Sequence, residues 1–279
     1  MKAADKKGVA MLAALGVMII LGLLSSVFLA HMKLARAYAV VDAQKLKAHY
    51  LGAAGVEGTI ARLKADSPEV DSYSDAWWTG SQETPLGDGV YATTVTDESA
   101  RVNVLTAQPQ MLGAILGGDQ QALARILEYR SSNKVFTVED LGSLGLGADA
   151  STRLKALCTT LGDGKVNINT ASSDVLAALP GMDADTAQRV VEFRKGVDGV
   201  EGTEDDFVFA APEDLAKAPG LTPAKVAPVL PLVKVNSNVF RVEAVGSIYK
   251  GIRIVSNKKI TAALSRDDSR NVTVTSWES

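Results

Sequence analysis

The sequence has few of the side chains from which common active sites are built. Its 279 residues include one cysteine, Cys158, and two histidines, His31 and His49. A single thiol excludes an internal disulfide framework and a four-cysteine metal site, so any bound metal would be held by oxygen atoms. Both histidines lie near the N-terminus, which excludes Ser-His-Asp and Cys-His catalysis in the region beyond His49. We therefore predict that the protein is not an enzyme.

The sequence also lacks a large excess of charge of either sign. It has 29 lysines and arginines against 32 aspartates and glutamates, a net charge of −3. A chain with this charge has no general attraction to polyanions, which disfavours broad nucleic-acid binding. Because 47% of its residues are hydrophobic, it has enough apolar material for one or two domains with their own cores.

Residues 9–30 form a run of 22 residues without an ionisable side chain. As a helix, this run is long enough to cross the hydrocarbon layer of a membrane, which is about 30 Å thick. The leader before it, residues 1–8, carries Lys2, Lys6 and Lys7, and a basic flank favours the cytoplasmic side. A secretory signal would have a shorter apolar run and a small-residue cleavage site. We therefore predict one membrane-spanning helix with the C-terminal region on the other side.

Residues 31–66 are predicted to continue this helix as a stalk. They contain no proline and are rich in alanine, leucine, lysine and arginine, a composition that favours helix. Gly52, Gly55 and Gly58 each weaken the helix by about 1 kcal/mol relative to alanine, so packing must hold that stretch. A signal anchor followed by a spacer helix would give the same pattern.

The junction between the leader and the apolar run resembles a known processing site. Gly8 follows Lys6-Lys7 and precedes Val9, which is similar to the prepilin-peptidase site of type IV pilins and pseudopilins. The resemblance implies cleavage after Gly8 by the prepilin peptidase and methylation of Val9. Most members have glutamate at the fifth position after the cut, where this sequence has Ala13. In this respect the chain resembles the minor pseudopilin K family of type II secretion systems.

The central region contains an internal repeat. Residues 102–107 correspond to residues 166–171, and residues 126–130 correspond to residues 190–194 at the same offset of 64. Further along, the offset grows to 73 and 74, so about nine residues are inserted in the second copy. Each copy reads as short helices joined by glycine-bearing turns, and the unit resembles a helix-hairpin-helix.

These hairpins are predicted to be structural and not to bind nucleic acid. Where DNA-binding hairpins have the second glycine of the turn, this chain has Asp183 and Thr222. An aspartate there places negative charge where a phosphate would approach the backbone N–H groups. Residues 105–232 also contain 11 basic against 17 acidic residues, which gives the region the wrong field for nucleic acid.

The insertion in the second copy is an acidic loop. Five carboxylates and two glycines lie between Asp198 and Asp206, with no basic residue among them. Such a loop repels itself unless it holds a cation, and Ca²⁺ takes six to eight oxygen ligands. The predicted ligands are the side chains of Asp198, Thr203, Asp205 and Asp206 and the carbonyl of Val200. A solvated acidic turn is the alternative, and the resemblance to pseudopilin K proteins also implies calcium binding here.

The C-terminal region alternates with period two and is rich in β-branched residues, which is typical of strands. We expect strands at residues 239–245, 252–255 and 272–275, and two earlier ones at 90–95 and 100–104. The fold class is therefore α+β, a pseudopilin fold in which a long N-terminal helix packs on an antiparallel sheet and an all-α domain of duplicated hairpin units is inserted. The predicted parts are the leader 1–8, the membrane helix 9–30, the stalk 31–66, the α+β domain 67–104 with 233–279, and the inserted domain 105–232.

This layout resembles the minor pseudopilin K family over nearly the whole chain. The resemblance implies a bacterial inner-membrane protein with a periplasmic C-terminal domain. It would lie at the tip of the type II secretion pseudopilus and initiate or cap its assembly for protein export across the outer membrane. It also implies as partners the minor pseudopilins of types I and J, further pseudopilins and the inner-membrane secretion platform. The alternatives are a minor pilin of a type IV pilus and a membrane-tethered helix-hairpin-helix receptor for DNA uptake.

Overall fold

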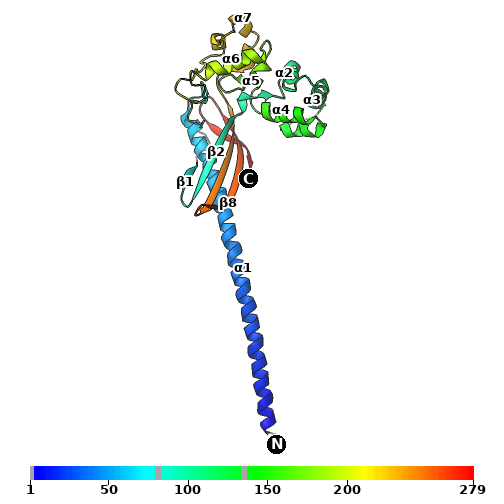
Figure 1. Cartoon of the computed structure of the whole chain (residues 1–279), viewed down its shortest axis with the longest axis vertical. Coiled ribbons are helices and arrows are strands. Elements are labelled where there is room, and N and C mark those ends of the chain that lie inside the picture. The colour runs from blue at the N-terminus through cyan, green and yellow to red at the C-terminus, as the bar shows by residue number, and fades with distance from the viewer. Residues whose placement is uncertain (1–2, 79–82, 133–136) are drawn as a thin grey trace.

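The computed structural model describes residues 3–78, 83–132 and 137–279, and it shows a head mounted at one end of a long helical rod (Figure 1). The rod is α1, a 63-residue helix from Ala3 to Ala65. From residue 8 onward it is long and apolar enough to cross a membrane, and none of its most apolar window is buried inside the protein. Residues 3–8 of the predicted leader, the predicted membrane helix and the predicted stalk up to Ala65 are therefore parts of one uninterrupted helix, and the apolar run fits a single-pass membrane anchor.

The C-terminal third of α1 packs against a sheet at very short range. Val56, Ile60 and Leu63 are buried in one core with side chains of the sheet. A Cβ added to Gly55 would lie 2.9 Å from Cγ2 of Thr93, and one added to Gly246 would lie 2.1 Å from the carbonyl oxygen of Ala48. Glycine at these two positions lets the helix and the sheet backbone approach closely, which compensates for the helix-weakening effect of glycine.

Within the described residues, the main sheet has five antiparallel strands in the order β1-β2-β7-β8-β9. Their bounds are β1 Thr84–Leu86, β2 Gly89–Asp97, β7 Val239–Lys250, β8 Arg253–Arg266 and β9 Val272–Glu278. The expected strands at 90–95, 239–245 and 272–275 lie within this sheet, and the one expected at 252–255 begins one residue later, at Arg253, because Ile252 belongs to the turn. The fold class is confirmed as an α+β arrangement of a long helix, an antiparallel sheet and a helical domain.

The expected strand at residues 100–104 is wrong. The structure has a short 3-10 helix at Glu98–Ala100 and a two-residue strand, β3 Val102–Asn103, outside the main sheet. The carboxylate of Asp97 accepts a hydrogen bond of 2.8 Å from the backbone N–H of Ser99, and this cap ends β2 and starts the turn. On its outer side β2 pairs with β1, a strand that was not predicted. Pro85 lies in β1, and a proline argues against a strand except at the edge of a sheet.

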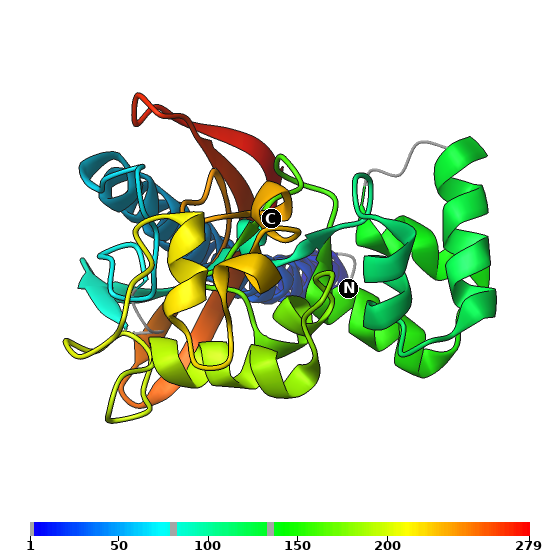
Figure 2. The same cartoon turned by 90° about the horizontal axis from the view of Figure 1, so that it is seen from above.

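The inserted region forms two helical lobes beyond the sheet (Figure 2). The first contains α2 Pro109–Ile115, α3 Gln120–Ser132, η2 Val138–Leu144 and α4 Ala148–Leu157. The second contains α5 Ser173–Ala177, α6 Ala184–Arg194, η3 Pro212–Lys217, α7 Pro223–Val226 and η4 Leu230–Leu232. Each lobe is tied at its base by two parallel two-residue strands, β3 with β4 Cys158–Thr159 and β5 Val166–Asn167 with β6 Val233–Lys234. The lobes share a hydrophobic core of their own.

The repeat in the sequence is also a repeat of hydrogen bonds. The guanidinium of Arg130 donates to two carbonyls of the turn after β3, at 2.9 Å each. The guanidinium of Arg194, 64 residues later, donates to the matching carbonyls of the turn after β5, at 3.0 and 2.9 Å. The four acceptors are Val104 and Ala107 in the first lobe and Ile168 and Ala171 in the second. The duplication is therefore structural, with an arginine at the same place in each copy.

A buried ionic cluster joins α1, the sheet and the second lobe. Arg266, at the end of β8, has a side chain that is 0% exposed. Its guanidinium pairs with Asp71 at 2.5 Å and with Asp66 at 3.1 Å. Asp71 also accepts the backbone N–H of Ser237 at 2.7 Å. Three segments thus meet at one cation: the one that follows α1, the one that returns from the helical lobes, and the end of β8.

Replacing Arg266 with methionine is expected to lower the free energy of unfolding by about 3 to 5 kcal/mol, because the buried carboxylate of Asp71 and the partly buried one of Asp66 would lose their counter-charge. Denaturant unfolding of the detergent-solubilised chain measures this. Lys259→Met, on the same strand, is the matched control, since the Lys259–Glu243 pair is about half exposed and such pairs contribute about 1 kcal/mol or less. Equal effects of the two substitutions would contradict the role of Arg266.

Candidate functional site

The acidic loop leaves the second lobe and rejoins it at the same place. Helix α6 ends at Arg194, and the backbone N–H of Phe207 donates to the carbonyl of Arg194 at 2.8 Å. The rings of Phe193 and Phe207 lie 4.6 Å apart, and Phe207 lies 5.2 Å from Phe209. These aromatic contacts fix both ends of the loop on the core, so residues 195–206 bulge out from a rigid base.

Inside the loop, Asp205 is the acceptor around which the backbone curls. Its carboxylate accepts the N–H groups of Val197 and Asp198 at 2.6 and 3.1 Å and the hydroxyl of Thr203 at 2.8 Å. These hydrogen bonds, led by the one from Thr203, lower the pKa of Asp205, so it stays charged. A Cβ added to Gly196 would lie 2.5 Å from the same carboxylate, and only glycine leaves room for it.

The remaining predicted ligands also belong to this loop network. The hydroxyl of Thr203 donates to the carbonyl of Val200 at 3.2 Å, and the N–H of Val200 donates to Asp198 at 2.8 Å. One carboxylate oxygen of Asp206 accepts the N–H of Gly202 at 2.6 Å. Its other oxygen, Oδ1, is buried and has no hydrogen-bond partner. A buried carboxylate oxygen without a donor is expected to have a ligand, and a cation fits that position.

The loop is docked onto the joint between sheet and lobe by residues that the sequence analysis did not identify. Arg194 Nη2 pairs with Glu201 of the loop at 2.6 Å, and its guanidinium lies 5.7 Å from the centre of the Tyr73 ring. The Tyr73 hydroxyl donates to the carbonyl of Thr170 at 2.8 Å, and burial raises its pKa to about 12. The repeated arginine was a signal for Arg194. Nothing near Tyr73 in the sequence indicates its partners, which lie about a hundred residues away.

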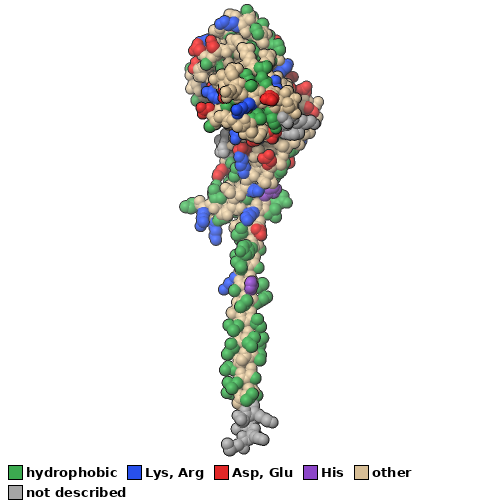
Figure 3. Space-filling view, turned by 90° about the vertical axis from the view of Figure 1, so that its right-hand side faces the viewer, with side chains coloured by type: hydrophobic (Ala, Val, Ile, Leu, Met, Phe, Trp, Pro, Cys, Tyr) green, Lys and Arg blue, Asp and Glu red, His purple; other side chains and the backbone are tan. Residues whose placement is uncertain are grey.

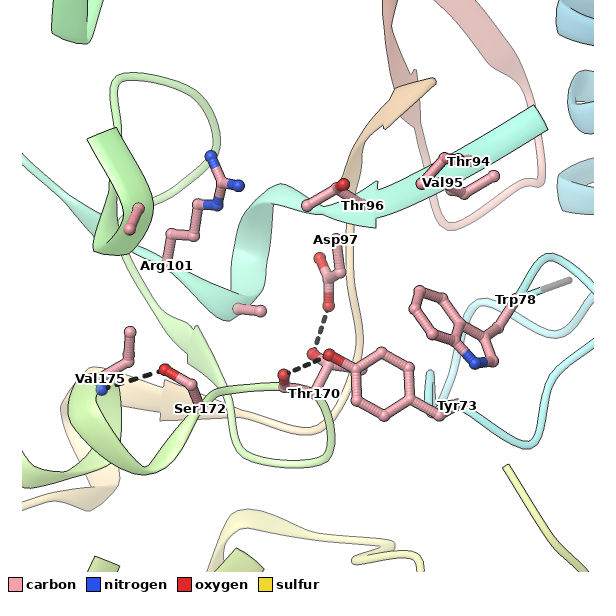
Figure 4. A pocket seen from close by; sticks show the side chains of 12 residues that line it. Tyr73, Trp78, Thr94, Val95, Thr96, Asp97, Arg101, Thr170, Ser172 and Val175 are labelled. Carbon is pink, nitrogen blue, oxygen red and sulfur yellow. Dashed lines mark hydrogen bonds between the residues drawn. The ribbon is translucent and has the colours of Figure 1, made fainter. Parts of the chain in front are cut away.

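A cavity of about 210 Å³ lies beside this joint, and Figure 4 shows its lining. The tilted rings of Tyr73 and Trp78, with centroids 4.4 Å apart, lie on one side, and Arg101 lies on the other. The polar group at its centre, Asp97, is fully engaged as an acceptor from Thr170 and from two further side chains, Ser237 and Asn167. We therefore assign the cavity to the joint and not to a binding site.

Two other groups of residues bear on the sequence predictions. Gly8 and Val9, the predicted processing residues, are exposed within the unbroken helix α1. Among the described residues, one group of three carboxylates has oxygen atoms within 4.8 Å of one another, and it consists of Asp66, Asp71 and Asp75. The predicted carboxylate ligands of the acidic loop do not form such a group. In the group of three, Asp66 and Asp71 already have Arg266 as their counter-charge. The structure thus links the predicted calcium ligands through hydrogen bonds without gathering their carboxylates tightly.

Comparison with known proteins identifies the fold. A family model described as a helix-hairpin-helix motif matches residues 163–234, which is the second lobe. A search of curated proteins found no match. Among solved structures, a chain of the GspK-GspI-GspJ complex from the enterotoxigenic Escherichia coli type 2 secretion system is similar with a TM-score of 0.61 and 14% identity, over 89% of this chain and 98% of that one. The protein therefore has a pseudopilin fold like that of GspK.

We propose that the acidic loop binds one calcium ion. The unpartnered Oδ1 of Asp206 carries this proposal, and Asp198, Thr203, Asp205 and the Val200 carbonyl would supply the other protein oxygens. The ion would neutralise carboxylates that otherwise repel one another and would fix the loop against Tyr73.

Calcium at a hundredfold excess over its Kd is expected to stabilise the native chain by about 2.7 kcal/mol, measured as a rise in melting temperature relative to chelator. The double variant Asp205→Asn with Asp206→Asn is expected to lose this rise. Glu204→Gln removes an exposed carboxylate from the same loop and is expected to keep it. A melting curve that does not respond to calcium in the unmodified chain would contradict the proposal.

Proposed function

We propose that this chain is a non-enzymatic minor pseudopilin that lies at the tip of a type II secretion pseudopilus and helps to begin or cap its assembly. The observation that carries the proposal is the fold match along nearly the whole length of a chain of the GspK-GspI-GspJ complex. The single apolar helix supports an inner-membrane anchor, and the basic leader supports a periplasmic head.

The residue at position 13 supports the tip position. A carboxylate within the bilayer is costly and is retained where a neighbour pairs with it. In pilin-like filaments, glutamate at the fifth position of the processed chain is understood to pair with the N-terminal amine of an adjacent subunit. Ala13 cannot pair in this way. A subunit with no neighbour above it would gain nothing from that carboxylate and would keep only its desolvation cost.

The shape of the head supports the same position. Figure 1 shows the helical lobes at the end of the head that is farthest from the N-terminus of α1. If α1 packs along a filament with its N-terminus toward the base, the lobes extend beyond the sheet at the upper end. A subunit stacked directly above would meet them, whereas at the tip they meet only solvent or secreted protein.

A DNA-uptake receptor is the second candidate, because the helix-hairpin-helix model matches the second lobe. The N-terminus of α6 argues against it. The Asp183 carboxylate accepts the N–H of Thr186 at 2.7 Å and so occupies the donors that a phosphate would need. Its pKa is lowered, first by that backbone hydrogen bond, so the group is anionic.

Processing after Gly8 is the first test of this proposal. In cells that contain the prepilin peptidase, mass spectrometry of the membrane-bound protein is expected to show a chain that starts at a methylated Val9. Blocking the junction with Gly8→Leu should leave Met1 in place, and Gly16→Leu, within the same helix, should not. An intact N-terminus in the unmodified protein would exclude a pseudopilin.

The assembly itself is the second test. Purified head, lacking residues 9–30, is expected to form a stoichiometric complex with the I-type and J-type minor pseudopilins, because α1 beyond the membrane and the sheet remain. Labelling of assembled filaments should place the protein at one end. If it occurs along the whole filament, the tip position is wrong, and if it assembles only with minor pilins of a type IV pilus, the secretion role is wrong.

A further inference from the structure

The turn between β7 and β8 is an exposed apolar tip flanked by cations. Ile252 at the turn is 103% exposed and Ile254 is 48% exposed, although both are large apolar side chains. Lys250 and Arg253, both exposed, flank Ile252 at the turn, and neither makes an ion pair among the described residues. A register shift at Tyr249 marks a bulge just before the turn, and bulges re-aim the end of a hairpin.

This tip points along α1 toward the membrane-spanning end. Figure 1 shows the β7–β8 turn at the edge of the head nearest the N-terminal half of the helix, and Figure 3 shows basic and hydrophobic side chains together at that edge. Of the acidic groups near it, Asp88 is neutralised by its pair with Lys47, whereas Glu83 accepts the hydroxyl of Tyr249 and keeps its charge, against the unpaired cations Lys250 and Arg253. The edge that faces the membrane is therefore positively charged.

The lengths of the elements bring the tip close to the bilayer surface. From Ala30, the end of the apolar run, to Ala48, which contacts Gly246, α1 rises about 27 Å. From Gly246 to Gly251 the hairpin returns by up to about 17 Å, so about 10 Å remain. The headgroup layer takes up about 6 Å of that. A helix tilt of about 20°, which is usual for spanning helices, is enough to bring the tip into the headgroups.

We propose that the Lys250–Ile254 hairpin docks on the surface of the membrane that α1 spans, with the cations on anionic phospholipid headgroups and Ile252 inserted among the headgroups toward the acyl chains. The proposal rests on α1 as a membrane anchor and not on the role in secretion. Each cation near an anionic surface contributes roughly a fivefold increase in affinity, and an exposed isoleucine adds to it. Docking fixes the tilt and rotation of the head before it leaves the membrane.

The test uses the full chain in proteoliposomes of phosphatidylcholine, alone or with about one third phosphatidylglycerol. A nitroxide label at Ile252→Cys is used to measure the ratio of two collision rates, the rate with membrane-soluble oxygen divided by the rate with a water-soluble nickel complex. With phosphatidylglycerol, this ratio is expected to rise at least about threefold at position 252 and to stay unchanged for Ser269→Cys, at the opposite end of β8. Cys158 is 1% exposed and does not compete for the label.

Charge reversal separates lipid docking from other contacts. Lys250→Glu with Arg253→Glu is expected to abolish the rise, whereas Arg153→Glu with Lys155→Glu, exposed cations on α4, is expected to keep it. High salt should reduce the rise in the unmodified chain. A ratio that is the same in both lipids, or shielding that appears only when other pseudopilin chains are added, would overturn the proposal, the second result by showing a protein interface.

Discussion

The arrangement of the head depends on one buried cation, the guanidinium of Arg266. A buried charge is costly unless it is paired, so every segment that supplies a partner is held in place by the others. Asp66 follows α1, Asp71 begins the next segment, and the carbonyl of Ser237 accepts from the same guanidinium at 3.2 Å. Helix, sheet and the chain returning from the lobes are thereby fixed at one point, which the apolar core beside them could not specify alone.

The insertion of two lobes into a sheet is possible because the chain leaves and returns at the same place. The lobes begin after Asp97 and end before Val239, and Asp97 pairs with Phe240 in the register of β2 and β7. When the two ends of an inserted segment are already adjacent, closing the sheet around it costs little loop-closure entropy. Asn167 and Thr170 from the second lobe bond to Asp97 at this point. The second lobe is thus anchored to the sheet, and the first extends from it.

The features that could be predicted from the sequence are those whose signals lie within a short stretch of residues. The membrane helix, the strands at 239–245 and the two-copy repeat were readable because composition and periodicity act over short windows. The strand expected at 100–104 was wrong because alternation of apolar residues cannot reveal that Asp97 caps a turn. The edge strand with Pro85 gave no strand signal at all. Tyr73 and Glu201 matter through Arg194, and such contacts between distant segments leave no trace in a single sequence.

The two arginines of the repeat show how the same structural residue is used with and without the added loop. Arg130 and Arg194 hold matching turns with matching hydrogen bonds, so the guanidinium has this structural role in the copy without the loop as well as in the copy with it. In the second copy the loop brings Glu201 to the free edge of Arg194. Within the part of the chain that the structure describes, Glu201 is paired with Arg194, and the other four carboxylates of the loop have no ion pair. The added loop therefore attaches itself to the lobe through existing charge and leaves a surplus of oxygen ligands, which is the chemistry that a divalent cation requires.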